Sequence, residues 1–223
     1  MLMKKIFTLI AVAAMALSAN AQTIKWTEVI EAGKVAAETY GSNGFVLTAT
    51  DTNDKMSVDK NTAYFGDTDA QKSFDYRLKV GGKSTSQNSL SLTIPEAGTL
   101  KVYVRTAKSS ETNRNVVLKQ NDAELINKVI KEDEASDYVT VQIEGVDKKV
   151  FPVVSAAVVA GTVAITYPVG ALNFYAFELV TATGIQTVKA TVLNDAQFNL
   201  AGQRVAADSK GLVVKNGKKV VKK

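Results

Sequence analysis

The sequence predicts an all-β protein: an antiparallel β-sandwich of the jelly-roll type, followed by a small C-terminal β-hairpin module. Three observations lead to this prediction. Apolar and polar residues alternate in residues 90–94 and again in residues 100–105, on either side of a turn at residues 95–98. Similar runs, bounded by turn-forming residues, recur about every ten residues. Few stretches have the 3.6-residue period of a helix, so a parallel α/β fold is disfavoured.

Each strand is expected from its own alternation, because successive side chains in a strand point to opposite faces. The first lies at residues 45–50, and Gly81 and Gly82 end the second. Residues 90–105 read as a hairpin, with one apolar face in both strands. The expected strands, in order, are residues 45–50, 73–80, 90–94, 100–105, 115–119, 138–144, 161–167 and 173–180, with apolar stretches at 150–155 and 156–160. This succession of short strands and turns is typical of a sandwich or jelly roll.

The first 21 residues have the three parts of a secretory signal peptide. Lys4 and Lys5 give a basic start, residues 6–17 are apolar, and Ala19-Asn20-Ala21 ends the segment with small residues. The apolar run is too short to span a membrane, and no later stretch is long enough. We therefore expect an exported protein without a transmembrane segment, with Gln22 as the first mature residue.

The chain contains no cysteine and no histidine. It therefore has no disulfides, and its stability must come from a hydrophobic core. A thiol nucleophile, an imidazole base and a zinc site with Cys or His ligands are excluded as well.

The C-terminal 42 residues differ from the rest of the chain in charge. Residues 182–223 carry 8 Lys and Arg against 2 Asp and Glu, whereas residues 22–181 carry 17 against 20. The lysines alternate with strand residues, which favours a solvated strand face over a nucleic-acid site. Asn216-Gly217 predicts a hairpin with a type I′ turn, because both central residues of that turn need positive φ. We expect three segments: a signal peptide (1–21), a sandwich (22–181) and a β module (182–223).

The tail resembles the short C-terminal sorting domains of the Por, or type IX, secretion system. The resemblance is carried by residues 198–205, FNLAGQRV, and residues 210–221, KGLVVKNGKKVV. It implies that secretion machinery binds the tail and that the protein is secreted or attached to the outer surface. The alternative location, which the signal peptide permits by itself, is the periplasm.

The middle of the chain is similar to β-sandwich modules of secreted bacterial polysaccharide lyases and pectinesterases. The residues that carry this similarity are 74–82, 92–103, 161–165 and 172–178. In those enzymes the module is non-catalytic and resembles a carbohydrate-binding jelly roll. The resemblance implies a glycan-binding accessory protein whose partner is a polysaccharide, although no enzyme is attached here.

Four residues are candidates for glycan binding. Trp26 is the only tryptophan, and an aromatic face can pack on a sugar ring. Tyr103 and Arg105 lie on the polar face of their strand, and Arg77 is expected on a neighbouring strand. An arginine pair would suit uronic acids, because guanidinium binds carboxylate in a fork. In the alternative interpretation, which the pattern favours, Trp26 belongs to the core and the others form cross-strand surface pairs.

Calcium is the one metal that the sequence suggests. Asp51, Asp54, Asp67 and Asp69 lie in Asp-rich stretches that could supply the oxygen ligands this ion requires. The spacing of an EF-hand is absent. Aspartate is also a common turn residue, because its side chain bonds to its own backbone, and this simpler interpretation is favoured.

An enzyme is the least favoured of three functional classes. Two carboxyl groups could hydrolyse a glycoside. An apolar context would raise the pKa of such an acid, but only Glu178 has apolar neighbours, Phe177 and Leu179. Glu178 falls on the face of its strand opposite to them, so we expect it to be solvated. The leading hypothesis is a secreted or surface-exposed, non-catalytic glycan-binding accessory protein. The second is a structural or adhesive surface protein without a sugar site, and the third is a fragment of a hydrolase or lyase.

Overall fold

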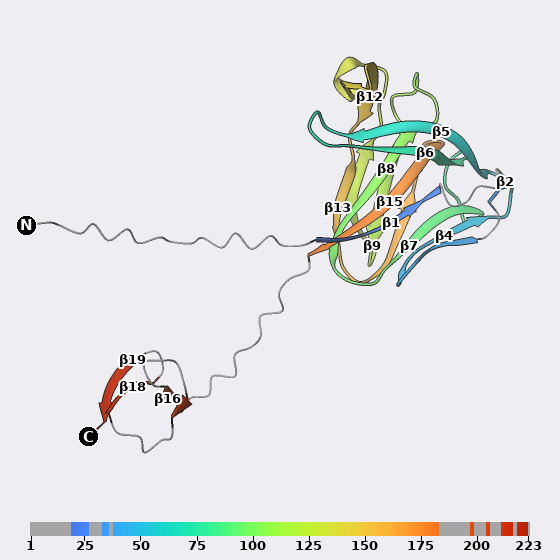
Figure 1. The fold of residues 1–223 in the computed structure, drawn as a ribbon. Coiled ribbons are helices and arrows are strands. Elements are labelled where there is room, and N and C mark those ends of the chain that lie inside the picture. The colour runs from blue at the N-terminus through green and yellow to red at the C-terminus, as the bar shows by residue number, and fades with distance from the viewer. Residues whose placement is uncertain are drawn as a thin grey trace, which may run out of the picture. The chain divides into compact units, whose positions relative to one another are not determined.

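The structure is a computed structural model, and Figure 1 shows its fold. It describes residues 19–26, 33–35, 38–182, 197–198, 204–205, 211–215 and 218–222. The chain divides into two compact units, Met1–Thr183 and Gly184–Lys223. Most of the expected signal peptide and the Asn216-Gly217 turn lie outside the described residues. Within the described residues, no helix is long and apolar enough to cross a membrane.

The larger unit is an all-β sandwich, as the sequence predicts, and two sheets enclose its main core. Sheet A has the order β11-β12-β5-β6-β15-β8-β13, with β1 paired to β15 and β2 to β5; sheet B has the order β10-β9-β14-β7-β4-β3. The strands of sheet A are β1 (Ala19–Lys25), β2 (Gly33–Lys34), β5 (Met56–Gly66), β6 (Gln71–Val80), β8 (Gly98–Thr106), β11 (Val139–Ile143), β12 (Val146–Phe151), β13 (Val154–Val158) and β15 (Leu172–Ala182). Those of sheet B are β3 (Glu38–Ser42), β4 (Phe45–Asp51), β7 (Asn88–Ile94), β9 (Asn115–Gln120), β10 (Ala123–Val129) and β14 (Gly161–Thr166).

The expected hairpin of residues 90–105 is wrong in one respect: its two strands lie in different sheets. β7 pairs with β4 and β14, whereas β8 pairs with β13 and β15. Leu92 of β7 and Val102 of β8 are both buried, because the two strands face each other across the core. β14 and β15, which also follow each other in the sequence, likewise lie in different sheets. Alternation in the sequence shows which face of a strand is apolar, but it does not show which strand lies next to it in the sheet.

The outer end of the β5–β6 hairpin forms a third layer on the outer face of sheet A. A register shift between Lys60 and Ala63 places one extra residue in β5, and a bulge of this kind bends a strand. Figure 1 shows β5 and β6 crossing over β8 and β15. The third layer buries a second, largely aromatic cluster, which consists of Ala63, Phe65, Phe74, Tyr103, Phe151, Tyr175 and Ala176. A face that alternation marks as polar is therefore partly interior.

β1 lies along the C-terminal half of β15, and its pairing begins within the expected signal sequence. Ala19 pairs with Ala182, and Gln22 pairs with Leu179. Cleavage after Ala21 would leave Gln22 as the first residue of this strand.

The smaller unit is a four-stranded sheet with the order β17-β16-β18-β19. Its strands are β16 (Gln197–Phe198), β17 (Arg204–Val205), β18 (Gly211–Lys215) and β19 (Lys218–Lys222). Lys215 pairs with Lys218, so the two strands expected on either side of Asn216-Gly217 are present in hairpin register.

Candidate binding groove

Trp26 lies in the main core, with 0% of its surface exposed. Its indole Nε1–H donates a hydrogen bond of 2.7 Å to the backbone oxygen of Phe174. The ring also meets Tyr40 edge to face, with 5.1 Å between ring centroids. Trp26 offers no exposed face to a sugar in this structure, and it occupies the core position of the alternative interpretation.

Tyr103 is also buried, with 2% of its surface exposed, in the second cluster beneath the third layer. Its hydroxyl donates a hydrogen bond to the carboxylate of Glu178. The Lys72 ammonium lies 2.6 Å from the same carboxylate. The expectation that Glu178 is solvated is therefore wrong, because only 3% of the surface of Glu178 is exposed. The cause is the third layer, which covers the outer face of β15 at this point.

Burial of Glu178 by itself raises the pKa of its carboxyl group, but its partners reverse this effect. The hydrogen bonds from Lys72 and Tyr103, together with the positive charge of Lys72, hold that pKa below its ordinary value. Burial, together with the hydrogen bond to Glu178, raises the pKa of Tyr103. At neutral pH Tyr103 is therefore a neutral phenol and Glu178 an ionised carboxylate. The two groups are hydrogen-bonded to each other, so they form a structural pair.

The two candidate arginines do not form a free pair for a uronic acid. The Arg77 guanidinium donates to the Asp59 carboxylate with a distance of 2.7 Å between Nε and Oδ1. Arg105 binds Glu132 through two hydrogen bonds and lies over the Phe151 ring, 4.1 Å from its centroid. Both guanidinium groups are thus neutralised by carboxylates of this chain, in the fork geometry that a ligand carboxylate would need.

The four aspartates considered for calcium lie in two separate turns. The Asp51 carboxylate accepts hydrogen bonds from the backbone N–H groups of Lys55 and Met56, at 2.8 and 2.7 Å. The Asp67 carboxylate accepts from the N–H groups of Asp69 and Ala70, at 2.9 and 2.8 Å.

These two turns precede and follow β5, whose 11 residues span roughly 30 Å or more when extended. One ion cannot bridge them. Among the residues that the structure describes, no three acidic side chains form a group able to hold a metal. Asp51 and Asp67 form the side-chain to backbone bonds that the turn interpretation expects, and calcium binding at either turn stays a prediction.

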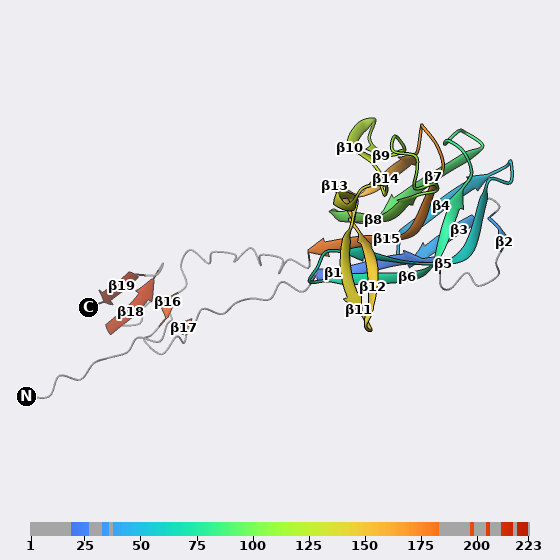
Figure 2. The same ribbon diagram turned by 90° about the horizontal axis from the view of Figure 1, so that it is seen from above.

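A groove of about 670 Å³ lies between the edges of the two sheets. β10 ends sheet B and β13 ends sheet A, and Figure 2 shows these two strands next to each other. At one end of this pair of strands, the amide of Gln120, the last residue of β9, bonds to Val159, the residue after β13: its Nε2–H donates to the Val159 oxygen at 2.8 Å, and its Oε1 accepts from the Val159 N–H at 3.0 Å. The groove lies towards the other end of both strands, beside residues 130–137.

The groove has an apolar floor and a polar rim. Val104, Ile126, Phe151 and Val154 supply apolar surface, and Val154 and Val104 belong to the main core. The rim is supplied by Lys128, Lys131, Ser136, Asp137 and Ser155, which bear amines, hydroxyls and a carboxylate. A concave site with apolar walls and a few polar groups is the usual form of a ligand site.

Both acids of the groove already have partners within the chain. Glu132 accepts from Arg105 and, at 2.9 Å, from the Thr106 N–H. Asp137 accepts from the Glu134 N–H at 3.1 Å, within the capping box of the short 3-10 helix η2 (Ala135–Asp137). Lys128 and Lys131 take part in none of the salt bridges found among the described residues. The groove is therefore lined by two lysines and two acids, and one of these acids, Glu132, is paired with Arg105.

The sequence predictions named none of the groove residues. A signal was present, however, in the segment from Ile126 to Ile130. Ile126, Lys128 and Ile130 alternate with Asn127 and Val129, which places a lysine between two isoleucines on one strand face.

No protein-family model matches the sequence, and no curated protein matches it. Two solved structures are similar in fold. One is described as "The complexity of the Ruminococcus flavefaciens cellulosome reflects an expansion in glycan recognition"; it is 13% identical, covers 73% of this chain and 95% of its own, and has a TM-score of 0.37. The other is the K1 cleaved adhesin domain of Lys-gingipain from Porphyromonas gingivalis W83, at 10% identity, 74% and 99% coverage and a TM-score of 0.40. Neither likeness is close enough to assign a function to this chain.

Proposed function

We propose that this chain is an exported, non-catalytic binding protein whose groove between β10 and β13 holds a segment of polysaccharide. The observation that carries the proposal is the groove itself, an open site with an apolar floor and a rim of amines, hydroxyls and a carboxylate. Sugar rings have apolar C–H faces and many hydroxyl groups, so they suit a surface of this composition. An open groove also lets a polymer enter and leave at its ends.

The chemistry of the groove supports binding without catalysis. Glycoside hydrolysis needs two carboxyl groups that are free to reach the substrate, one as an acid and one as a nucleophile or base. In the groove, Glu132 is held by Arg105 and Asp137 caps the η2 turn. The chain also lacks the histidine and cysteine that most other hydrolytic mechanisms use.

The N-terminal segment and the tail support a surface location. The expected signal peptide and the resemblance of residues 198–221 to sorting domains both indicate export. An exported module with a binding groove and no catalytic group would hold its cell, or a partner enzyme, close to a glycan.

The test is binding to a glycan array and titration calorimetry, with calcium and with a chelator. We expect the mature chain to bind at least one polysaccharide, and the variant Ser155→Trp to lose most of that affinity, because Ser155 lines the groove. Ala157→Trp is the matched control: it lies on the same exposed face of β13 and outside the groove.

Binding that Ser155→Trp leaves intact would move the site away from the groove. If no glycan binds, the proposal is wrong, and the structural or adhesive alternative takes its place.

A further inference from the structure

The hairpin of β11 and β12 extends from the sandwich as a two-stranded ribbon. β12 pairs with β5 only at Val150 and Phe151, and the rest of the hairpin pairs with no other strand that the structure describes. Figure 2 shows its closed end reaching past β6. Two strands alone are marginally stable in water, whereas three or more with an apolar face are stable. A further strand beside this ribbon would therefore stabilise it.

The free strand of this ribbon, β11, has an edge without charges. Val139, Val141 and Ile143 share one face, and Thr140 and Gln142 share the other. Val139 is 37% exposed, and Val141 and Ile143 are half-buried. An exposed, uncharged edge strand rich in β-branched residues readily pairs with another strand, so proteins usually protect such edges.

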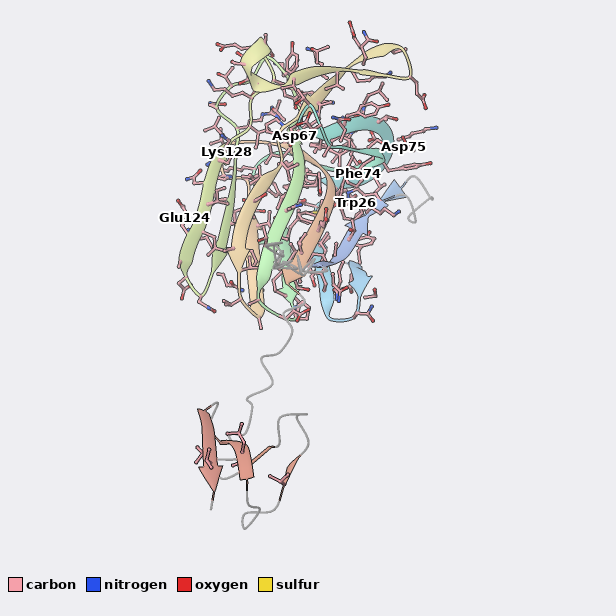
Figure 3. All side chains as sticks on the ribbon, turned by 60° about the vertical axis from the view of Figure 1, so that its left-hand side comes forward. Trp26, Asp67, Phe74, Asp75, Glu124 and Lys128 are labelled. Carbon is pink, nitrogen blue, oxygen red and sulfur yellow. The ribbon has the colours of Figure 1, made fainter. Side chains whose placement is uncertain are left out.

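Other end strands of the two sheets have the protection that β11 lacks. β10 carries the charged residues Glu124 and Lys128, which Figure 3 labels, and a register shift interrupts its pairing with β9. β13 has β10 beside it. β11 contains no charged residue, no proline and no register shift, and none of the described strands lies on its outer side. Its edge is therefore open to a partner strand.

A second copy of this chain fits the edge, because antiparallel pairing centred on Val141 is self-complementary. In that register Val139 lies opposite Ile143 of the second copy, and Val141 lies opposite Val141. Thr140 lies opposite Gln142, so apolar residues meet apolar residues and polar residues meet polar ones. A shift by one residue would mix the two faces. The two hairpins together then form a sheet of four strands.

The charges at the ends of this register also match. Glu144 lies opposite Tyr138 of the second copy, and within each chain the Lys149 ammonium lies 4.0 Å from the Tyr138 ring centroid. Glu144 and Lys149 are exposed, and neither takes part in the salt bridges found among the described residues. Asp137, the nearest acid, already accepts from the Glu134 N–H. The two-fold axis produces the contact between Glu144 and Lys149 twice.

We propose that this protein forms a homodimer in which β11 pairs antiparallel with β11 of a second copy, centred on Val141. A strand of five residues gives an interface at the small end of the range for specific complexes, about 1,200 Å² or less. The dimer is therefore weak and depends on concentration. Ser136 and Asp137, which line the groove, directly precede β11, so the dimer contains two grooves. Pairing requires no glycan, and the inference does not rest on the proposed function.

The experiment is analytical ultracentrifugation of the mature chain over a series of concentrations. We expect a monomer–dimer equilibrium, and we expect Val141→Lys to raise its dissociation constant by at least about tenfold, because two like charges then lie directly opposite each other. Val169→Lys is the matched control. Val169 is 50% exposed and lies in the turn between β14 and β15, so this variant should stay within about twofold of the wild type.

A charge exchange tests the ends of the interface. Glu144→Lys and Lys149→Glu should each weaken the dimer, because each places like charges together across the interface. The double variant restores opposite charges and should recover the affinity of the wild type. A loss that came only from misfolding of the hairpin would not be recovered in this way.

The absence of cysteine from the chain allows a test of the register. Val141→Cys should form a disulfide-linked dimer on mild oxidation, because the two cysteines lie opposite each other within bonding distance. Val139→Cys alone should link slowly, but it should link readily when mixed with Ile143→Cys. Val169→Cys measures the background from random collisions.

Three results would overturn the inference. The mature chain could stay monomeric at every concentration, the dimer could keep its affinity in Val141→Lys, or Val141→Cys could link no faster than Val169→Cys. Each of these results leaves the proposed function standing, because glycan binding is measured separately.

Discussion

At the scale of single residues, Glu178 is the clearest case of a polar group with a structural role. It lies on the outer face of β15, where the third layer covers it, and it binds both Tyr103 and Lys72. An ionised carboxylate in such a place is stable only because its hydrogen bonds replace the water it has lost. Its low pKa therefore makes the stability of the sandwich depend on pH.

We predict that Glu178→Gln lowers the free energy of unfolding by about 1–3 kcal/mol at pH 7, the usual effect of losing hydrogen bonds to a charged group. The carboxyl group has a lower pKa in the folded protein than in the unfolded chain. Its stabilising effect is therefore complete above about pH 5 and is lost as the pH falls through the folded pKa. Urea unfolding of both proteins from pH 7 to pH 3 checks this: the gap should shrink in acid.

Glu124→Gln is the control for that measurement, since Glu124 is an exposed acid of β10 (Figure 3). It should follow the wild type within about 0.5 kcal/mol at every pH. A gap between wild type and Glu178→Gln that stays constant down to pH 3 would show that the pKa of Glu178 does not differ between the folded and unfolded states.

At the scale of elements, the segment from Ile130 to Asp137 shows how one ion pair can position a wall of the groove. The sequence of this segment indicates only an exposed acidic loop. In the structure, Glu132 anchors it to β8 through Arg105 and the Thr106 N–H. The guanidinium in turn lies on the Phe151 ring, so β8, β12 and the loop meet at one contact.

We predict that Glu132→Gln loosens this wall. The neutral amide cannot form the same charged fork, and Arg105 loses its anion, so the stability should fall by about 1–3 kcal/mol. Amide hydrogen exchange, read by mass spectrometry, should become at least tenfold faster in residues 131–137. Asp133→Asn, an exposed position in the same loop, should leave exchange there unchanged. Unaltered exchange in Glu132→Gln would mean that other contacts position the loop.

The positions of many strands can be predicted from the sequence, but the pairing of those strands within the sheets cannot. Alternation in residues 90–94 and 100–105 identified both strands and both core faces, because burial of one face is a local property of the sequence. The assignment of β7 and β8 to different sheets depends on long-range pairing that a period of two does not encode. For the same reason, alternation places Tyr103 on a polar outer face, whereas the third layer buries it.

The candidate site follows the same rule. The sequence directs attention to residue types suited to glycans, and the structure shows Arg77 and Arg105 already paired with Asp59 and Glu132. Which carboxylate reaches which guanidinium depends on strands far apart in the chain.

At the scale of the whole molecule, the chain consists of two units that differ in size and charge. The sandwich has its own core, with large side chains such as Phe174 and Phe177 completely buried. The smaller unit is a four-stranded sheet rich in lysine, with Val213 buried within it. Each unit buries apolar surface, and the sandwich is large enough to fold by itself.

We predict that a chain ending at Thr183 keeps the fold and the thermal midpoint of the sandwich, within about 2 °C, but loses its location. The resemblance of the tail to sorting domains implies that residues 184–223 direct the protein to the cell surface. Fractionation of the native host should find the full chain outside the cell or on its surface, and the truncated chain in the periplasm. Lys218→Ala with Lys219→Ala keeps the length of the tail and tests whether its charge is part of the signal. A truncated chain that unfolds would show that the tail stabilises the sandwich, and one that still reaches the surface would show that export does not depend on it.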